Sequence, residues 1–220
     1  MSTATTKQTN IDGIEILYWD KDIIVANKPA GMLTVPGRGP DKQDCLISQI
    51  VKHFEDALIV HRLDMATSGI VLIARGADNH RNLSKQFQNR ETDKSYVAVI
   101  YGLLDTDSGR VDLPLICDWP NRPKQMVCFE NGKPSLTHFR VLERNIEKNI
   151  SRVELTPITG RSHQLRVHML AINHVICGDE LYAQGAALEA SPRLLLHAQQ
   201  LQFSHPNNDK KMSFFCPASF

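Results

Sequence analysis

Apolar residues in the first half of the chain form two kinds of pattern, continuous runs and helical spacing. Runs rich in β-branched residues and bounded by turn-forming residues predict strands. Such runs cover residues 14–19, 23–26, 57–60, 69–74 and 96–101, and the first two predict a hairpin. Helical spacing of apolar residues predicts a helix over 44–54 and an exposed helix over 78–90, with Leu83 and Phe87 on one face.

The second half of the chain has a pattern dominated by strands. The runs that predict them cover residues 125–129, 137–142, 152–155, 194–203 and 211–215. One helix is predicted over 162–172, with Leu165, Met169 and Ile172 on one face. Because strands and helices do not alternate regularly, a doubly wound parallel sheet is not expected. The pattern predicts an α+β fold with a largely antiparallel, mixed sheet flanked by helices and loops.

The length of 220 residues is enough to bury a core without disulfide or metal staples. We expect a flexible tail over 1–12 and a single domain over 13–220. No apolar run is long enough to span a membrane, and residues 1–10 do not resemble a secretory signal. Five cysteines without a C-x-x-C pair predict reduced thiols and no zinc site. P-loop, dinucleotide and hydrolase-elbow motifs are absent from the sequence.

The net charge of +1 gives no overall sign of nucleic-acid binding. Acidic residues are nevertheless missing between Asp22 and Asp41, between Asp118 and Glu130, and between Glu154 and Asp179. A neutral protein can present one basic face if its acids lie elsewhere. Chance spacing of the charges is the alternative.

Two polar clusters are candidates for chemistry. The first, residues 61–69, lies between two predicted strands and places Asp64 two residues from Arg62. An Asx-type turn is the structural alternative for this cluster. The second, residues 159–168, begins a helix that Thr159 or Ser162 could cap.

In the second cluster, Arg161 and Arg166 could pair with an anion or a carboxylate. A solvated basic helix face is the alternative. His163 and His168 are five residues apart, which does not suit two metal ligands on one helical face.

Four motifs, in this order, resemble those of the RluA-type pseudouridine synthases, and the resemblance covers nearly the whole chain. They are Asn27-Lys28-Pro29-x-Gly31, His61-Arg62-Leu63-Asp64-x-x-Thr67-Ser68-Gly69, Lys94-x-Tyr96-x-Ala98-x-x-x-Gly102 and Gly160-Arg161-x-His163-Gln164-Leu165-Arg166-Val167-His168. The resemblance implies the pseudouridine synthase fold, with an active-site cleft across the sheet and without the extra N-terminal RNA-binding domain of longer relatives.

The resemblance also implies an activity: isomerisation of uridine to pseudouridine in RNA, without a cofactor or metal. The catalytic aspartate falls on Asp64, the active-site arginine on Arg166, and the tyrosine that stacks on the target base on Tyr96. Arg62 matches an arginine that enters the space left by the flipped base. The remaining candidates for RNA contacts are His61, Arg161, His163 and Gln164.

Residues 113–125 resemble most closely the short, dual-specificity members of this family. That likeness implies two substrates, a hairpin-loop uridine of 23S rRNA and an anticodon-loop uridine of some tRNAs. We expect a monomeric cytoplasmic enzyme. The alternatives are a catalytically silent RNA-binding module on the same fold, and a hydrolase for which the sequence offers neither a nucleophile nor a metal site.

Overall fold

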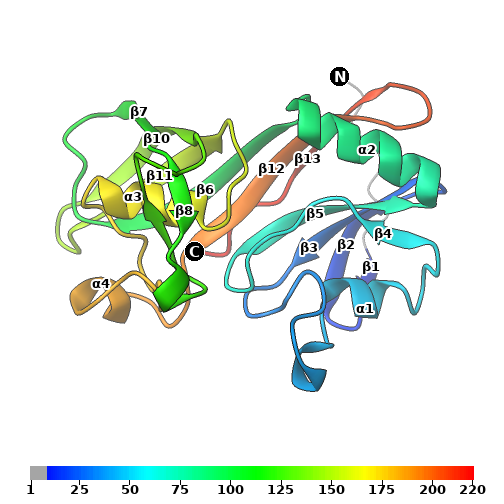
Figure 1. Cartoon of the computed structure of the whole chain (residues 1–220), viewed down its shortest axis with the longest axis horizontal. Coiled ribbons are helices and arrows are strands. Elements are labelled where there is room, and N and C mark those ends of the chain that lie inside the picture. The colour runs from blue at the N-terminus through cyan, green and yellow to red at the C-terminus, as the bar shows by residue number, and fades with distance from the viewer. Residues whose placement is uncertain (1–8) are drawn as a thin grey trace. The chain divides into compact units, whose positions relative to one another are not determined.

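The computed structural model describes residues 9–220, which form two compact units (Figure 1). Unit 1 contains residues 9–94 and 198–219, and unit 2 contains residues 95–197 and Phe220. Residues 1–8 of the expected tail lie outside the described residues. Thr9–Ile11 form strand β1, which pairs antiparallel with β2. The single domain predicted over 13–220 contains residues of both units.

Unit 1 is built on strands that neighbour one another in the order β1-β2-β3-β5-β12, with β4 beside β5 and β13 beside β12. After β1, these strands are β2 (Ile14–Trp19), β3 (Ile23–Lys28), β4 (Ala57–Ile59), β5 (Ser68–Arg75), β12 (Leu196–Ser204), which enters unit 1 at Ala198, and β13 (Lys211–Phe215). Helix α1 spans Leu46–Ile50, the short 3₁₀ helix η1 spans Pro40–Lys42, and α2 spans Ala77–Asn89.

The core of unit 1 explains the spacing of its apolar residues. Val25 of β3, Leu72 of β5 and Phe203 of β12 belong to one buried cluster. Helix α2 packs on β4 and β5 (Figure 1). It adds Leu83 to this cluster, and Phe87 packs against the cluster partly buried. The apolar face predicted for this helix is therefore confirmed.

Unit 2 contains strands in the order β6-β11-β10-β7 and a separate pair, β8-β9. They span β6 (Asp93–Tyr101), which enters unit 2 at Ser95, β7 (Ser108–Asp112), β8 (Leu115–Cys117), β9 (Gln125–Val127), β10 (Leu136–Asn145) and β11 (Ile150–Pro157). The helices are η2 (Trp119–Asn121), α3 (Gln164–Ala171) and α4 (Ala186–Glu189). Helix α3 packs against β9, β10 and β11.

The predicted fold class is confirmed, because the paired strands within each unit form antiparallel ladders flanked by few helices. The predicted hairpin is β2–β3. The helix predicted over 44–54 ends already at Ile50, because the next residues form turns that lead into β4. Strand β7 was not predicted, since only Val111 of its residues is buried.

The five cysteines are free thiols, as expected, and burial raises the pKa of Cys177 and of Cys216 to about 11. No helix within residues 9–220 is long and apolar enough to cross a membrane.

Candidate active site

Asp64 lies in the loop that joins β4 to β5, and Thr34 fixes the backbone beside it. The Thr34 hydroxyl donates to the Leu63 carbonyl at 2.8 Å and accepts from the Leu63 N–H at 3.2 Å. The Thr67 N–H donates to the Asp64 carbonyl at 3.1 Å and closes a turn. These bonds connect the loop to a segment about thirty residues earlier in the chain, and they restrict how the Asp64 backbone can move.

Lys28 also binds the main chain of the same loop, at Met65. Its ammonium group is fully buried and donates to the carbonyls of Pro29, Met32 and Met65 at 2.8, 2.8 and 3.2 Å. Three acceptors match its three N–H donors. Burial lowers the pKa of Lys28 to about 8, against the opposing effect of the Asp64 carboxylate charge.

The motif Asn27-Lys28-Pro29-x-Gly31 therefore has a structural explanation that the sequence did not supply. The Gly31 N–H also donates to the Met65 carbonyl at 2.9 Å, with Gly31 at φ +85°. Lys28 and Gly31 thus both donate to the carbonyl of Met65, the residue that follows Asp64.

His61, a predicted RNA contact, makes its contacts with residues inside unit 1. Its Nε2 accepts the Leu72 N–H at 3.0 Å, and its ring stacks on Phe87 at a centroid distance of 4.4 Å. Burial, and secondarily the charge of Lys94, lowers the pKa of His61 to about 3. The ring is therefore neutral at physiological pH. Arg62, the next residue, has an exposed side chain.

Tyr96 lies on β6 of unit 2, opposite Leu155 of β11, and its side chain is partly exposed. The strand explains this exposure, because Tyr96 alternates with Ser95 and Val97, which are buried on the other face. Strand β6 therefore leaves partly exposed the aromatic ring to which the family resemblance assigned base stacking.

The start of α3 differs from the expected capping by Thr159 or Ser162. The N-cap residue is His163, in the left-handed region at φ +53°. Thr159 instead donates its hydroxyl to the Gln164 Oε1 at 2.7 Å, and that oxygen also accepts the Arg161 N–H at 3.1 Å. The Gln164 amide nitrogen donates to the Leu136 carbonyl and to Thr137, each at 3.0 Å. The side chain of Gln164 is therefore buried and satisfied within unit 2, and the loop before α3 closes around it.

Arg166 follows on the same helix and pairs with an acid that the sequence did not single out. Its Nε and Nη2 donate to the two carboxylate oxygens of Asp179 at 2.7 and 2.6 Å. Arg166 is 4% exposed and Asp179 is fully buried. The only sequence signal was that Asp179 ends the longest acid-free stretch. His168, by contrast, is buried against Thr137 and Leu113.

The predicted residues thus form one group in each unit. In unit 1 the loop before β5 carries His61, Arg62 and Asp64. In unit 2, α3 and the residues just before it carry Arg161, His163, Gln164 and Arg166, with Tyr96 on β6.

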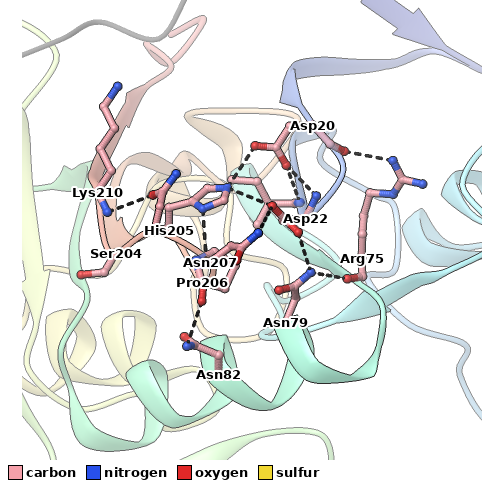
Figure 2. A network of polar contacts seen from close by, with 12 residues as sticks. Asp20, Asp22, Arg75, Asn79, Asn82, Ser204, His205, Pro206, Asn207 and Lys210 are labelled. Carbon is pink, nitrogen blue, oxygen red and sulfur yellow. Dashed lines mark hydrogen bonds and ion pairs between the residues drawn. The ribbon is translucent and has the colours of Figure 1, made fainter.

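A third polar cluster, Asp20, Asp22 and His205, places metal-binding types of atom within 4.8 Å of one another (Figure 2). Asp20 accepts from the N–H groups of Asp22 and Ile23 at 2.8 Å each and from His205 at 3.0 Å. Asp22 accepts from the Asn79 amide at 3.2 Å. These bonds identify a hydrogen-bonded hub that ties the β2–β3 turn to α2 and to the β12–β13 connection.

Comparisons with known proteins agree with the motifs. The model of the RNA pseudouridylate synthase family matches residues 22–171. Relatives named dual-specificity RNA pseudouridine synthase RluA are 51% identical in Yersinia pestis and 52% identical in Escherichia coli, each over 205 residues. Both matches cover 93% of this chain, and they cover 99% and 93% of the respective relatives.

Solved structures show the same fold. Human RNA pseudouridylate synthase domain containing 1 superposes with a TM-score of 0.81 at 28% identity, over 96% of this chain and 86% of the other. Human RNA pseudouridylate synthase domain containing 4 superposes with a TM-score of 0.73 at 24% identity, over 92% and 87%.

The chain belongs to the RNA pseudouridylate synthase family. It is an RNA pseudouridine synthase, an isomerase, as the four motifs predicted. The relatives it matches at about half identity carry the name RluA, and nothing in these matches supports a catalytically silent module.

Proposed function

We propose that this RNA pseudouridine synthase has two kinds of substrate, a hairpin-loop uridine of 23S rRNA and an anticodon-loop uridine of some tRNAs. The observation that carries the proposal is about 50% identity, over 93% of the chain, to relatives named for dual specificity. Loop uridines are suitable targets because unstacked bases can be splayed out and read by a protein.

In this proposal Asp64 performs the chemistry. The N-glycosidic bond of the uridine breaks and the base rejoins the sugar through carbon, which loses a proton while the ring nitrogen gains one. The carboxylate either attacks C1′ or takes a sugar proton as the base leaves. Because no atom is gained or lost overall, the reaction needs no redox cofactor or nucleotide.

Two residues of unit 2 are proposed to take part in the reaction. Arg166 is proposed as the active-site arginine and Tyr96 as the residue that stacks on the target base, with a stacking contribution of about 1–3 kcal/mol. What supports these roles is the match of each residue to its family motif.

The proposed RNA contacts divide by their surroundings. Arg62 and Arg161 are exposed. Arg62 is suited to enter the space left by the flipped base, and Arg161 to bind a phosphate. His163, partly exposed, is a further proposed contact. The bonds that His61 and Gln164 make inside their units favour a role in shaping the site over direct contact with RNA. We further propose that the enzyme acts as a monomer in the cytoplasm.

The assignment of Asp64 is tested by Asp64→Asn. We expect turnover to fall by about 10⁴-fold or more, because the amide cannot act as nucleophile or base. RNA affinity should persist, because phosphate contacts supply most of it. The measurements are pseudouridine formation in a purified stem-loop RNA and the Kd for that RNA.

The matched control is Asp78→Asn, which removes an exposed carboxylate on α2 of the same unit. It should keep the wild-type rate. Turnover by purified Asp64→Asn protein near the control rate would remove Asp64 from the chemistry.

Substrate choice is tested by mapping pseudouridines in RNA from cells that lack this protein. Dual specificity predicts the loss of at least one site in 23S rRNA and one in tRNA anticodon loops. Loss in only one RNA class would contradict the dual specificity and leave the isomerase activity intact.

A further inference from the structure

The strongest unassigned arrangement in unit 2 is the ion pair between Arg166 and Asp179. The carboxylate receives the Nε edge of the guanidinium through two parallel hydrogen bonds of 2.7 and 2.6 Å. Such bidentate geometry fixes both the position and the plane of the guanidinium. Because both residues are almost completely buried, water competes little for either partner.

Asp179 is itself held in place by the turn that contains it. Its Oδ1 accepts the N–H groups of Leu181 and Tyr182 at 3.0 and 3.2 Å, and its carbonyl accepts the Ala183 N–H at 2.8 Å. The preceding Gly178 has φ +69°, and a Cβ there would lie 2.0 Å from the Arg193 carbonyl oxygen. The turn therefore has little freedom to shift, and neither has the carboxylate.

Tyr182 restrains the face of the same guanidinium. Its ring centroid lies 5.0 Å from the Arg166 Cζ. Its hydroxyl accepts the Gln125 N–H at 2.8 Å and lies 2.8 Å from His163 Nδ1. Asp179 on the edge and Tyr182 on the face together allow one placement of the arginine head group.

We propose that Asp179 is a positioning residue, which holds the Arg166 guanidinium in its working geometry before RNA binds. This inference rests on the proposed role of Arg166 in the active site. A long arginine side chain samples many rotamers, and ordering it during each turnover would add to the barrier. Asp179 removes that step, and two of the five guanidinium donors are enough to do so.

The test measures single-turnover rates at saturating stem-loop RNA, together with the Kd for that RNA. Asp179→Asn keeps an oxygen that can accept the turn N–H groups but loses the charge and one arginine bond. We expect its rate to fall roughly 10- to 100-fold, the order expected for a misplaced catalytic group, with a Kd within about 3-fold of wild type. Asp179→Ser, which can also cap the turn, should fall at least as far.

A double-mutant cycle separates positioning from a general structural effect. Arg166→Met should be slow, and adding Asp179→Asn should slow it no further, because Asp179 acts through Arg166. The matched control is Asp107→Asn, which removes an exposed carboxylate that pairs with Arg144 of unit 2, and it should keep the wild-type rate. Additive losses in the double variant would contradict the inference.

The outcomes distinguish the two proposals. If Arg166→Met keeps the wild-type rate, the role of Arg166 itself is wrong. If Arg166→Met is slow while Asp179→Asn matches wild type, only the positioning role is wrong.

A measurement on the wild-type protein applies even if both Asp179 variants fail to fold. The Nε–H of Arg166, observed by ¹⁵N NMR, should exchange slowly with water in the free enzyme and keep its shift when RNA binds. Exchange in the free enzyme as fast as in free arginine would overturn the inference.

Discussion

His61 lies three residues before Asp64, yet its ring is held neutral within unit 1. The Leu72 N–H needs an acceptor, and the unprotonated Nε2 supplies one at 3.0 Å. Protonation would remove that acceptor and place a charge against Phe87. Burial of the ring, and secondarily the charge of Lys94, lowers its pKa to about 3.

This gives a prediction for stability as a function of pH. The folded pKa lies below the value of about 6.5 expected when unfolded, so the unfolded state binds the extra proton first. The contribution of His61 is fully present above pH 6.5 and is lost as pH falls toward 3. In His61→Gln, the free energy of unfolding should decline less steeply across this window, by up to about 1.4 kcal/mol per pH unit.

The measurement is urea unfolding at a series of pH values. Gln88→Ala, a change at an exposed position of the same unit that alters no titratable group, serves as the control and should retain the wild-type slope. Identical slopes for the wild type, His61→Gln and the control would show that the pKa of His61 is the same in the folded and unfolded states.

At the scale of elements, β5 depends on a glycine at its second position. Gly69 has φ +118°, and a Cβ there would lie 2.3 Å from the Ala198 carbonyl oxygen of β12. The strand that leads away from the Asp64 loop is therefore in direct backbone contact with β12. Any side chain at this position would push the two strands apart.

Gly69→Ala should destabilise the protein by roughly 2–5 kcal/mol, the sum of a left-handed backbone penalty and overpacking. Gly76→Ala is the matched control, because Gly76 has φ +76° but a Cβ added there would meet no heavy atom within 4 Å. It should cost only about 1–2 kcal/mol. The measurement is the urea midpoint of each variant. Equal losses of stability would mean that the contact with β12 adds nothing to the cost of Gly69→Ala.

At the scale of the whole molecule, the net charge is only +1, although the enzyme acts on RNA, a polyanion. Binding therefore depends on where basic groups are exposed. Arg62 and Arg161 are exposed, whereas Lys28 and Arg166 are buried in carbonyl or carboxylate contacts. The first pair is suited to contact RNA directly, and the second is held by contacts inside the protein.

Arg62→Ala should distinguish base flipping from phosphate binding. If Arg62 fills the gap left by the target base, it offsets a flipping cost of a few kcal/mol, most of which is lost stacking and pairing. The variant should therefore lose more activity on a folded stem-loop than on a short unstructured strand with the same uridine. The measurement is the ratio of mutant to wild-type kcat/KM on each RNA.

The rival roles make a different prediction. Loss of a phosphate contact would lower the salt dependence of binding on both RNAs alike, and loss of a brace for Asp64 would slow both equally. Equal ratios on the two RNAs would reject the flipping role.

The sequence by itself determined much of this protein. Runs of apolar and β-branched residues bounded by turn residues placed most strands within a few residues, because burial of one or both sheet faces leaves a local signal in the sequence. Four ordered motifs indicated the family and singled out Asp64, Tyr96 and Arg166. Local spacing missed β7, whose residues are mostly exposed, and the three-residue strands β1 and β8. It also overextended α1, whose end depends on the turns that follow.

Only the tertiary structure decided which residues support the candidate site. The Lys28 ammonium reaches the Met65 carbonyl across 37 positions, and Arg166 reaches Asp179 across 13. The Gly69 requirement comes from Ala198, on a strand near the other end of the chain. None of these partners leaves a periodic trace, because a hydrogen bond or a steric contact depends on distance in space and not on spacing along the chain.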